Sequence, residues 1–319
     1  LEFESHVFDI AFHPSEDIVA AGLITGEVHC YKLNVGDGAE NSHLFSSDHH
    51  KKSCRALAFS HNGDSLYTAS KDKSLQVLDS STGKLKLRKA DAHDDPLNCL
   101  LNLNENLLAS GDDGGAVKIW DLRQKKKVIS WKENQDFISD MSFVAHKKTL
   151  VVTSGDGCLS IFDIRKPAPV CVSDNQDDEL LSVAIVKNYK KAVVGTQDGV
   201  LSIFSWGNWG DCTDRFPGHP SSIDAIVKID ENTICTGSSD GLIRVVGILP
   251  NRLIGILGDH GEGMPIERLK LSGSNSWIGS CSHDSVVKFW DVASSADDQT
   301  HDNQSDEDDD DEDDDEDED

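Results

Sequence analysis

Short runs of alternating apolar and polar residues fill most of this chain, and the same order of runs recurs seven times. The second copy is clear, with alternating runs at 54–59, 65–69 and 75–78 separated by turns at 61–64 and 71–73. Alternation with a period of two, interrupted by Asn-Gly and Asp-Gly turns, is typical of short antiparallel β-strands joined in hairpins. The pattern predicts an all-β protein without helices, in which each copy supplies three strands and a variable, solvent-facing fourth.

A tight-turn position, usually an Asp that follows a Ser or Thr, gives the spacing of the copies. Thr25 fills it in the first copy, and the later copies have Asp72, Asp112, Asp156, Asp198, Asp240 and Asp284. The successive separations are 47, 40, 44, 42, 42 and 44 residues. A strand-rich repeat of about 40–45 residues is typical of a β-propeller with one blade per repeat. The sequence therefore predicts a seven-bladed β-propeller.

The ring formed by seven such units must close between the last copy and the first. After the third strand of the last copy, residues 293–299 are small and polar and cannot form an outer strand. Ahead of His6, Leu1 and Phe3 alternate with polar residues. We therefore expect residues 1–5 to provide the outer strand of the seventh blade and to close a propeller that occupies residues 1–292.

The charge of the chain is concentrated at one end. Residues 306–319 are an unbroken acidic run that accounts for about half of the net charge of −27. Such a run buries nothing and repels itself, so residues 293–319 are expected to form a disordered acidic tail. The remaining body is mildly acidic on average, which argues against direct DNA binding. No apolar run is long enough for a membrane helix, so no membrane association is predicted.

The eight cysteines are scattered, and most lie inside apolar strand patterns. None forms a Cys-x-x-Cys pair, and no set of ligands has the short spacing that a zinc site requires. We therefore expect free thiols in a reducing compartment. Neither a cofactor nor a small-molecule substrate is predicted.

Serine, histidine and aspartate recur together in a way that first suggests a hydrolase. In the third unit the set is His93, Ser110, Asp112 and Trp120, and in the seventh it is His260, Ser282, Asp284 and Trp290. Weaker sets occur in the second and sixth units, as His50, Ser70 and Asp72 and as His219, Ser238 and Asp240. A catalytic triad occurs once per active site, whereas a repeated set indicates a structural group that ties the strands of a blade together. The sequence therefore predicts no enzyme, with a hydrolase as a distant alternative.

Ser-x-Asp turns combined with Trp120-Asp121 and Trp290-Asp291 at the ends of third strands resemble the WD-repeat propellers. Segments at 11–22, 70–79 and above all 235–252, which contains Ile-Leu-Pro-Asn-Arg, resemble the WD repeat-containing protein 55 family. The resemblance covers residues 6–292. It implies a scaffold of the nucleus and nucleolus, with the cytoplasm as a further location. It also implies binding of pre-ribosomal or basic assembly proteins in ribosomal RNA processing and ribosome biogenesis.

A second resemblance concerns residues 108–123, which end in Trp120, Asp121, Leu122 and Arg123. They resemble the box by which propellers dock onto DNA damage-binding protein one, the adaptor of cullin-four ubiquitin ligases. The next unit ends in a near copy that contains Asp163 and Arg165. Each guanidinium could make bidentate contacts from the face opposite the Asp turns. Because an Arg in this place is common in propellers that never meet a ligase, adaptor docking is kept as the alternative function.

Polar residues near the start of the first strand of each unit are expected to surround the mouth of the central channel. They form a predicted partner face that consists of Arg55, Asn98, Asp140, Asp224 and Glu267. Their mixed, mostly acidic chemistry suits a basic protein partner, although each could equally be a solvated rim position.

The acidic tail has three competing explanations: a solubilising segment, an electrostatic handle for basic proteins, or a platform for phosphorylation. Acid-directed kinases favour serines that are followed by acids, and this context predicts phosphorylation at Ser294, Ser295 and Ser305. For a nucleolar propeller, a salt-sensitive handle on basic assembly proteins suits best.

Overall fold

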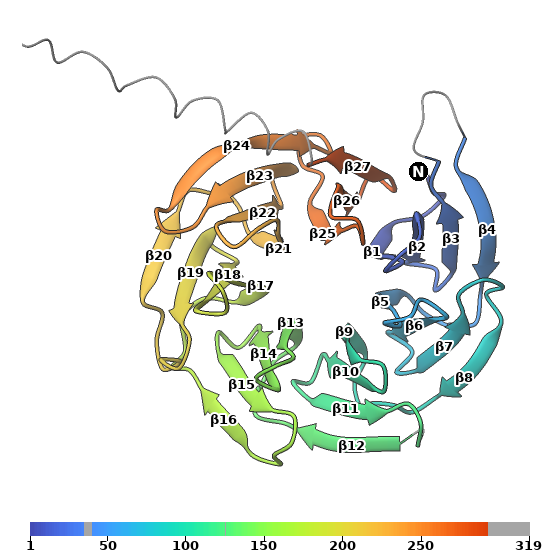
Figure 1. Cartoon of the computed structure of the whole chain (residues 1–319), viewed down its shortest axis with the longest axis horizontal. Coiled ribbons are helices and arrows are strands. Elements are labelled where there is room, and N and C mark those ends of the chain that lie inside the picture. Colours follow the sequence, from blue (N-terminus) through green and yellow to red (C-terminus); the bar gives the residue numbers. More distant parts are fainter. Residues whose placement is uncertain (35–39, 125, 293–319) are drawn as a thin grey trace, which may run out of the picture.

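The computed structural model describes residues 1–34, 40–124 and 126–292. Within these ranges it contains 27 β-strands and no helix, and the strands form seven sheets around a common axis (Figure 1). Each sheet is an antiparallel meander in which the strands follow one another in chain order. The prediction of an all-β, seven-bladed propeller is confirmed. The predicted tail at 293–319, with Ser294, Ser295 and Ser305, lies outside the described residues.

Four strand positions, numbered from the axis outward, describe six of the blades, and the seventh blade has the first three of them. The first strands are β1 (Val7–Phe12), β5 (Cys54–Phe59), β9 (Leu97–Asn104), β13 (Ile138–Val144), β17 (Leu180–Val186), β21 (Ile223–Lys228) and β25 (Ile266–Leu271). The second strands are β2 (Ile18–Leu23), β6 (Ser65–Ser70), β10 (Leu107–Asp112), β14 (Thr149–Ser154), β18 (Lys191–Thr196), β22 (Thr233–Ser238) and β26 (Trp277–Ser282). The third strands are β3 (Val28–Lys32), β7 (Leu75–Asp79), β11 (Val117–Asp121), β15 (Leu159–Asp163), β19 (Val200–Ser205), β23 (Leu242–Gly247) and β27 (Val287–Asp291). The outer strands are β4 (Ser42–Ser47), β8 (Leu85–Lys89), β12 (Lys126–Trp131), β16 (Pro169–Val172), β20 (Asp214–Pro217) and β24 (Arg252–Asp259).

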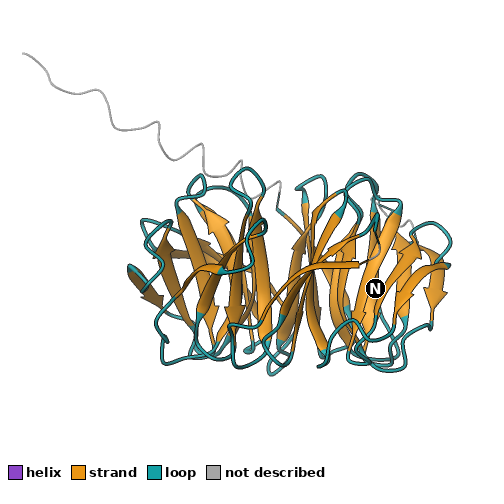
Figure 2. Cartoon of the chain, turned by 90° about the horizontal axis from the view of Figure 1, so that it is seen from below, coloured by secondary structure: helices purple, strands orange, loops and turns teal. Residues whose placement is uncertain are grey.

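Because the strands of each blade alternate in direction, their connections gather on two faces of the ring (Figure 2). We call the face with the tight turns between second and third strands the turn face. The opposite face carries the turns between first and second strands and those between third and outer strands. No described segment is a helix of the length and apolar character that crossing a membrane requires.

Each tight turn on the turn face contains one residue with a positive φ, and these residues give the true register of the repeat. They are Gly26, Lys73, Gly115, Gly157, Gly199, Gly241 and Ser285, with separations of 47, 42, 42, 42, 42 and 44 residues. In blades two and four to seven an Asp directly precedes this residue, whereas in the third blade Gly114 does and Asp112 lies two residues earlier. The aspartate separations of 40 and 44 around that copy therefore do not give the length of the repeat. Asp112 does not occupy the turn position of the other aspartates, and the turns themselves are 42 residues apart on both sides.

Seven apolar clusters hold the ring together, and each one spans the junction between two neighbouring blades. At the junction of the third and fourth blades, Trp131 stacks on Phe162 with ring centroids 4.5 Å apart. Ile138 and Ala109 are completely buried in the same cluster. Burial of one such large side chain contributes roughly 1.5–3 kcal/mol, so each blade depends on both of its neighbours.

The N-terminal residues close the ring, as the alternation of Leu1 and Phe3 predicted. The Leu1 ammonium donates to the Val287 carbonyl at 2.7 Å, and the Val287 N–H donates back to the Leu1 carbonyl at 2.8 Å. The Phe3 N–H donates to the Ser285 carbonyl, and the Phe3 ring meets Tyr31 edge-on with centroids 5.8 Å apart. Residues 1–3 therefore pair with residues 285–287 at the start of the third strand of the seventh blade and pack against the first blade. They form an isolated bridge, so the prediction of a full outer strand at residues 1–5 is wrong and the sheet of the seventh blade has three strands.

Replacement of Phe3 by Ala should destabilise the closed ring. The change removes an aromatic side chain that packs in the cluster between the seventh and first blades. We expect the free energy of unfolding in urea to fall by about 2 kcal/mol. Glu4→Ala, at an exposed neighbouring position, is the control and should leave it unchanged. Equal stability of the Phe3→Ala variant and the parent chain would show that residues 1–3 do not close the ring.

Candidate partner-binding site

The histidine-centred set of the third blade is assembled as the sequence predicted. His93, from the loop before β9, places Nδ1 2.7 Å from Asp112 Oδ2 and Nε2 2.7 Å from Ser110 Oγ. The Trp120 indole N–H donates to the same Ser110 oxygen at 2.8 Å. If His93 carries its proton on Nδ1, it donates to Asp112 and accepts from the Ser110 hydroxyl, so every polar group of the set is satisfied.

These residues form hydrogen bonds in the same order as a catalytic triad, but they are buried inside the blade. Ser110 is completely buried, and its oxygen is occupied by His93 and Trp120. Burial lowers the pKa of His93 despite the opposing effect of Asp112, so the imidazole is neutral. Burial raises the pKa of Asp112, but the His93 and Ala116 hydrogen bonds outweigh it and leave that pKa below its usual value. No substrate can reach Ser110, so the set holds the blade together.

In the seventh blade the predicted serine is wrong. His260 lies 2.7 Å from Asp284 through Nδ1, but its Nε2 lies 2.7 Å from Ser280 Oγ, and Trp290 donates to Ser280 at 2.8 Å. Ser282 is buried, and its hydroxyl has no hydrogen-bond partner among the described residues. The serine that contacts the His and the Trp lies two residues after the residue that pairs with the Trp on the neighbouring strand. Its distance from the Asp in the sequence does not identify it.

The same register explains the weaker sets in the second and sixth blades. Thr68, not Ser70, meets His50 Nε2 at 2.7 Å, and Thr236, not Ser238, meets His219 Nε2 at 2.8 Å. His50 Nδ1 lies 3.5 Å from Asp72 Oδ1. In the sixth blade Asp240 pairs with Arg244 instead of the histidine. The predicted roles of Ser70, Ser238 and Asp240 are therefore wrong.

The two predicted docking arginines occupy matching positions on the opposite face. Arg123 follows β11 and Arg165 follows β15, and each guanidinium forms a side-on pair with an Asp two residues earlier. The shortest contacts are 2.8 Å for Arg123–Asp121 and 2.7 Å for Arg165–Asp163. Each arginine lowers the pKa of its Asp to about 2 by hydrogen bonding. The arginine side chains are 64% and 66% exposed, so both are held in place and accessible.

Three of the five predicted partner-face residues line one cavity at the axis. Arg55, Asn98 and Glu267 surround a volume of about 460 Å³ together with Phe8, Asp113, Asp136, Phe137 and Arg268. Arg55 donates to both carboxylate oxygens of Asp113, at 2.8 and 2.7 Å. Glu267 pairs with His283 from the adjacent tight turn. The channel mouth therefore carries charges of both signs, many of them already paired.

Asp140 belongs elsewhere, which corrects its placement on the partner face, whereas Asp224 shares the strand position of Arg55, Asn98 and Glu267. Asp140 lies one strand position further along than the others, and its Oδ2 accepts the Val183 N–H of the next blade at 3.0 Å. Asp9 does the same for Leu57 at 2.7 Å. Asp224 accepts hydrogen bonds from two serine hydroxyls. These carboxylates tie loops and neighbouring strands together.

The sequence reasoning missed Arg268, which shares the strand position of Asp9 and Asp140. Burial lowers its pKa, but Asp9, Asp140 and Glu267 outweigh that effect and leave the guanidinium firmly charged. One signal in the sequence could have identified Arg268, because it directly follows the predicted partner-face residue Glu267 in a first strand. Among the described residues, no group of three or more His, Cys, Asp or Glu side chains could hold a metal ion.

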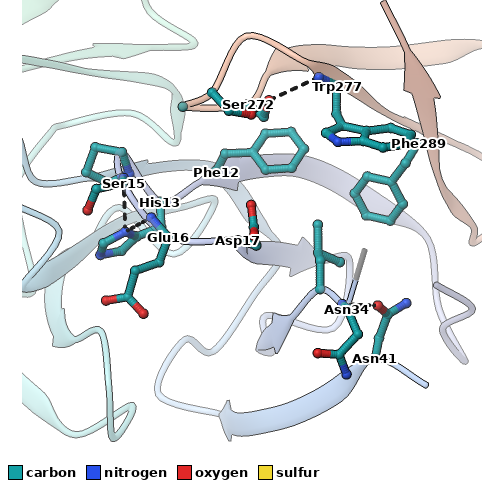
Figure 3. Close-up of a pocket in the computed structure, with 14 residues that line it drawn as sticks. Phe12, His13, Ser15, Glu16, Asp17, Asn34, Asn41, Ser272, Trp277 and Phe289 are labelled. Carbon is teal, nitrogen blue, oxygen red and sulfur yellow. Dashed lines mark hydrogen bonds between the residues drawn. The ribbon is translucent and has the colours of Figure 1, made fainter. Parts of the chain in front are cut away.

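A second open cavity lies between the seventh and first blades on the opposite face (Figure 3). It measures about 570 Å³, and Phe12, Leu33, Trp277 and Phe289 form an apolar floor. The Phe12 and Phe289 rings meet edge-on with centroids 6.1 Å apart. We call this site the aromatic cleft. The sequence reasoning missed it, because its walls come from both ends of the chain.

Acidic residues stand at the edge of the aromatic cleft. Glu16 and Asp17 are exposed in the turn between β1 and β2 and line the cavity. The buried His13 ring holds this turn, since its Nδ1 accepts the N–H groups of Ser15 at 3.3 Å and Glu16 at 3.0 Å. An apolar floor beside two carboxylates suits a protein segment that carries both an apolar and a basic side chain.

The two serines of β26 provide a matched test of the histidine-centred set. Ser280→Ala removes the partner of both His260 and Trp290, so the free energy of unfolding should fall by about 1–3 kcal/mol. Ser282→Ala removes a buried hydroxyl that has no partner among the described residues and should leave stability unchanged or raise it. Urea unfolding of both variants gives the comparison. A larger loss of stability at Ser282 than at Ser280 would contradict the register described above.

Comparison with known proteins places the chain in a family. The WDR55 family model matches residues 1–295. WD repeat-containing protein 55 of Danio rerio is 50% identical over 302 residues, which cover 95% of this chain and 78% of that protein. The Homo sapiens protein is 42% identical, covering 91% and 75%, and the Arabidopsis thaliana protein is 41% identical, covering 92% and 82%. The chain therefore belongs to the WD repeat-containing protein 55 family.

Proposed function

We propose that the chain is a non-enzymatic scaffold of the nucleus and nucleolus that binds basic assembly proteins during ribosomal RNA processing and ribosome biogenesis. The observation that carries this proposal is the contrast between its two kinds of site. The side chains that imitate a triad are sealed inside the blades, whereas the aromatic cleft is open and edged by acids. Open apolar surface with a charged edge supports protein binding, and sealed serines give no support to catalysis.

The chemistry of the cleft indicates the class of partner. Glu16 and Asp17 lie beside Phe12 and Trp277, so a segment with an aliphatic or aromatic residue next to Lys or Arg would gain both burial and charge pairing. The process itself is proposed from the family resemblance.

The test is rescue of precursor processing in cells depleted of the protein. Depletion should cause precursor ribosomal RNA to accumulate, and the parent chain should restore normal levels. The Glu16→Lys, Asp17→Lys double variant should fold but fail to restore them, because it repels a basic partner. Glu105→Lys with Asp91→Lys makes the same charge change at exposed positions outside the cleft and should restore them.

The proposed process and the proposed binding site are contradicted by different results. Normal precursor levels after depletion would remove ribosome biogenesis as the process. Full restoration by the Glu16→Lys, Asp17→Lys variant would remove the aromatic cleft as the binding site and leave the process standing.

A second candidate function is docking onto the DNA damage-binding protein one adaptor of a cullin-four ubiquitin ligase. It is favoured by the matching geometry of Arg123 and Arg165 in consecutive blades, both side-on to an Asp and mostly exposed. A guanidinium already held by its neighbour loses little conformational entropy when a partner binds.

The Arg123→Ala, Arg165→Ala double variant should therefore reduce the adaptor recovered by co-purification at least about tenfold, since two accessible bidentate groups are removed. Arg215→Ala with Arg252→Ala is the matched control, because these exposed arginines lie in outer strands and have no Asp two residues before them. Equal recovery by all three proteins would exclude this docking mode.

A further inference from the structure

Basic side chains concentrate on the opposite face where the fourth and fifth blades meet. Lys147 and Lys148 lie in the turn between β13 and β14, and Lys190 lies in the turn between β17 and β18. The two turns touch, since Lys147 Nζ donates to the Tyr189 carbonyl at 3.3 Å. Arg165 borders them, because the Ile164 N–H bonds to the Lys148 carbonyl. The mildly acidic average of the body hides this local excess of positive charge.

The acids that border this region leave the lysines free. Asp163 pairs with Arg165, and Glu231 pairs with Lys228. Lys148 and Lys190 are exposed, and no side-chain contact holds their ammonium groups in the described part of the chain. Their charge is therefore available to an anionic ligand.

Aromatic rings lie beside these lysines, and a further ammonium group, Lys228 Nζ, lies 5.9 Å from the centroid of the Tyr189 ring. Tyr189 is 41% exposed, and the exposed His146 ring lies edge-on to it with centroids 4.6 Å apart. Lys147 Nζ lies 3.8 Å from the centroid of the Trp206 ring. We call Lys147, Lys148, Lys190, His146, Tyr189 and Trp206 the basic-aromatic surface. Aromatic faces beside positive charges are how proteins hold single-stranded nucleic acids without reading a sequence.

The backbone under Tyr189 is unusual. Lys187, Asn188 and Tyr189 have φ values of 54°, 52° and 61°, and the Lys190 N–H bonds to the Lys187 carbonyl. A turn of this kind normally places Gly after Asn, because a bulky residue in the left-handed region costs energy. A Tyr in the Gly position is therefore unfavourable for folding, and such outliers gather at functional sites.

We propose that the basic-aromatic surface binds single-stranded RNA, with lysines neutralising phosphates and the Tyr189 ring stacking on a base. An acidic protein segment would use the lysines but has no need of an exposed ring on a strained turn, so RNA fits the observations better. The inference goes beyond the proposed scaffold function and does not rest on it. It also departs from the expectation that average charge excludes a nucleic-acid-binding body.

The test measures fluorescence anisotropy of a labelled single-stranded oligouridine with the full chain over a series of potassium chloride concentrations. We expect binding that weakens as salt rises. The Lys148→Glu, Lys190→Glu variant should bind about tenfold or more weakly, with a salt slope shallower by about 0.7 for each phosphate that is no longer neutralised. Lys51→Glu with Lys52→Glu, which changes two exposed lysines near the turn face, should bind as the parent does.

The Tyr189→Gly variant distinguishes a loss of base stacking from a loss of folding. It removes the ring but relieves the left-handed backbone, so the melting temperature should be equal or higher while affinity for the oligonucleotide falls about fivefold or more. Tyr189→Phe keeps a stacking ring and should retain affinity. A normal melting temperature in Tyr189→Gly rules out misfolding as the cause of weaker binding.

Three results with the oligonucleotide would overturn the proposal: no binding by the parent chain at low salt, parental affinity in the Lys148→Glu, Lys190→Glu variant, or equal affinity in Tyr189→Gly and Tyr189→Phe. A labelled peptide with the sequence of residues 306–319 forms the second arm. If the peptide binds more tightly than the oligonucleotide and Tyr189→Gly leaves its affinity unchanged, the surface serves an acidic protein segment and the RNA proposal is wrong.

Discussion

The packing of each blade against the next is the interaction on which the rest of the structure depends. A single four-stranded sheet of this kind has two apolar faces and cannot cover them alone. Seven clusters, one at each junction, cover these faces around the whole of the described ring. Closure by residues 1–3 matters for that reason. Without it, Ser285 and Val287 would lose their outer hydrogen-bond partners and the first blade would lose part of its cover.

Polar groups inside such thin sheets must find their partners within the blade or in the next one. The histidine-centred sets do this for the loops that lead into the first strands, and Asp9 and Asp140 do it between neighbouring blades. A buried carboxylate, imidazole and hydroxyl that satisfy one another adopt the same order as a catalytic triad, because both arrangements obey the same hydrogen-bonding rules. Access to solvent decides between the two, and the buried Ser110 has none.

The repeat period made the fold predictable, since every blade needs the same turn and the same alternation. It also made closure by Leu1 and Phe3 predictable. The register inside a blade was harder to infer. Asp112 reaches His93 from two residues ahead of the position that the Asp has in the other blades. Counting back two residues from the Asp therefore gave the correct serine in the third blade, Ser110. The same count gave Ser282 in the seventh blade, where the serine that contacts the histidine is Ser280.

The surfaces that can bind partners were the least predictable part. The aromatic cleft unites Phe12 with Trp277 and Phe289, which the ring brings together from opposite ends of the sequence. The residues of the basic-aromatic surface lie mainly in turns, where the side chains do not follow the repeat. The positive φ of Tyr189 could not be predicted from the repeat pattern for the same reason. Asp140 was misassigned because a shift of one position along a strand sends a side chain to another environment.

Ring geometry also sets where these surfaces stand relative to one another. The aromatic cleft occupies the junction of the seventh and first blades, and the basic-aromatic surface occupies the junction of the fourth and fifth, both on the same face. They are four junctions apart in one direction and three in the other, almost diametrically opposed. Two ligands held there would not collide, and a particle broad enough to reach both would be gripped with the avidity of a bivalent contact. The rigid ring therefore fixes the distance between the two proposed surfaces, and a bivalent partner would have to match that distance as well as the chemistry of each surface.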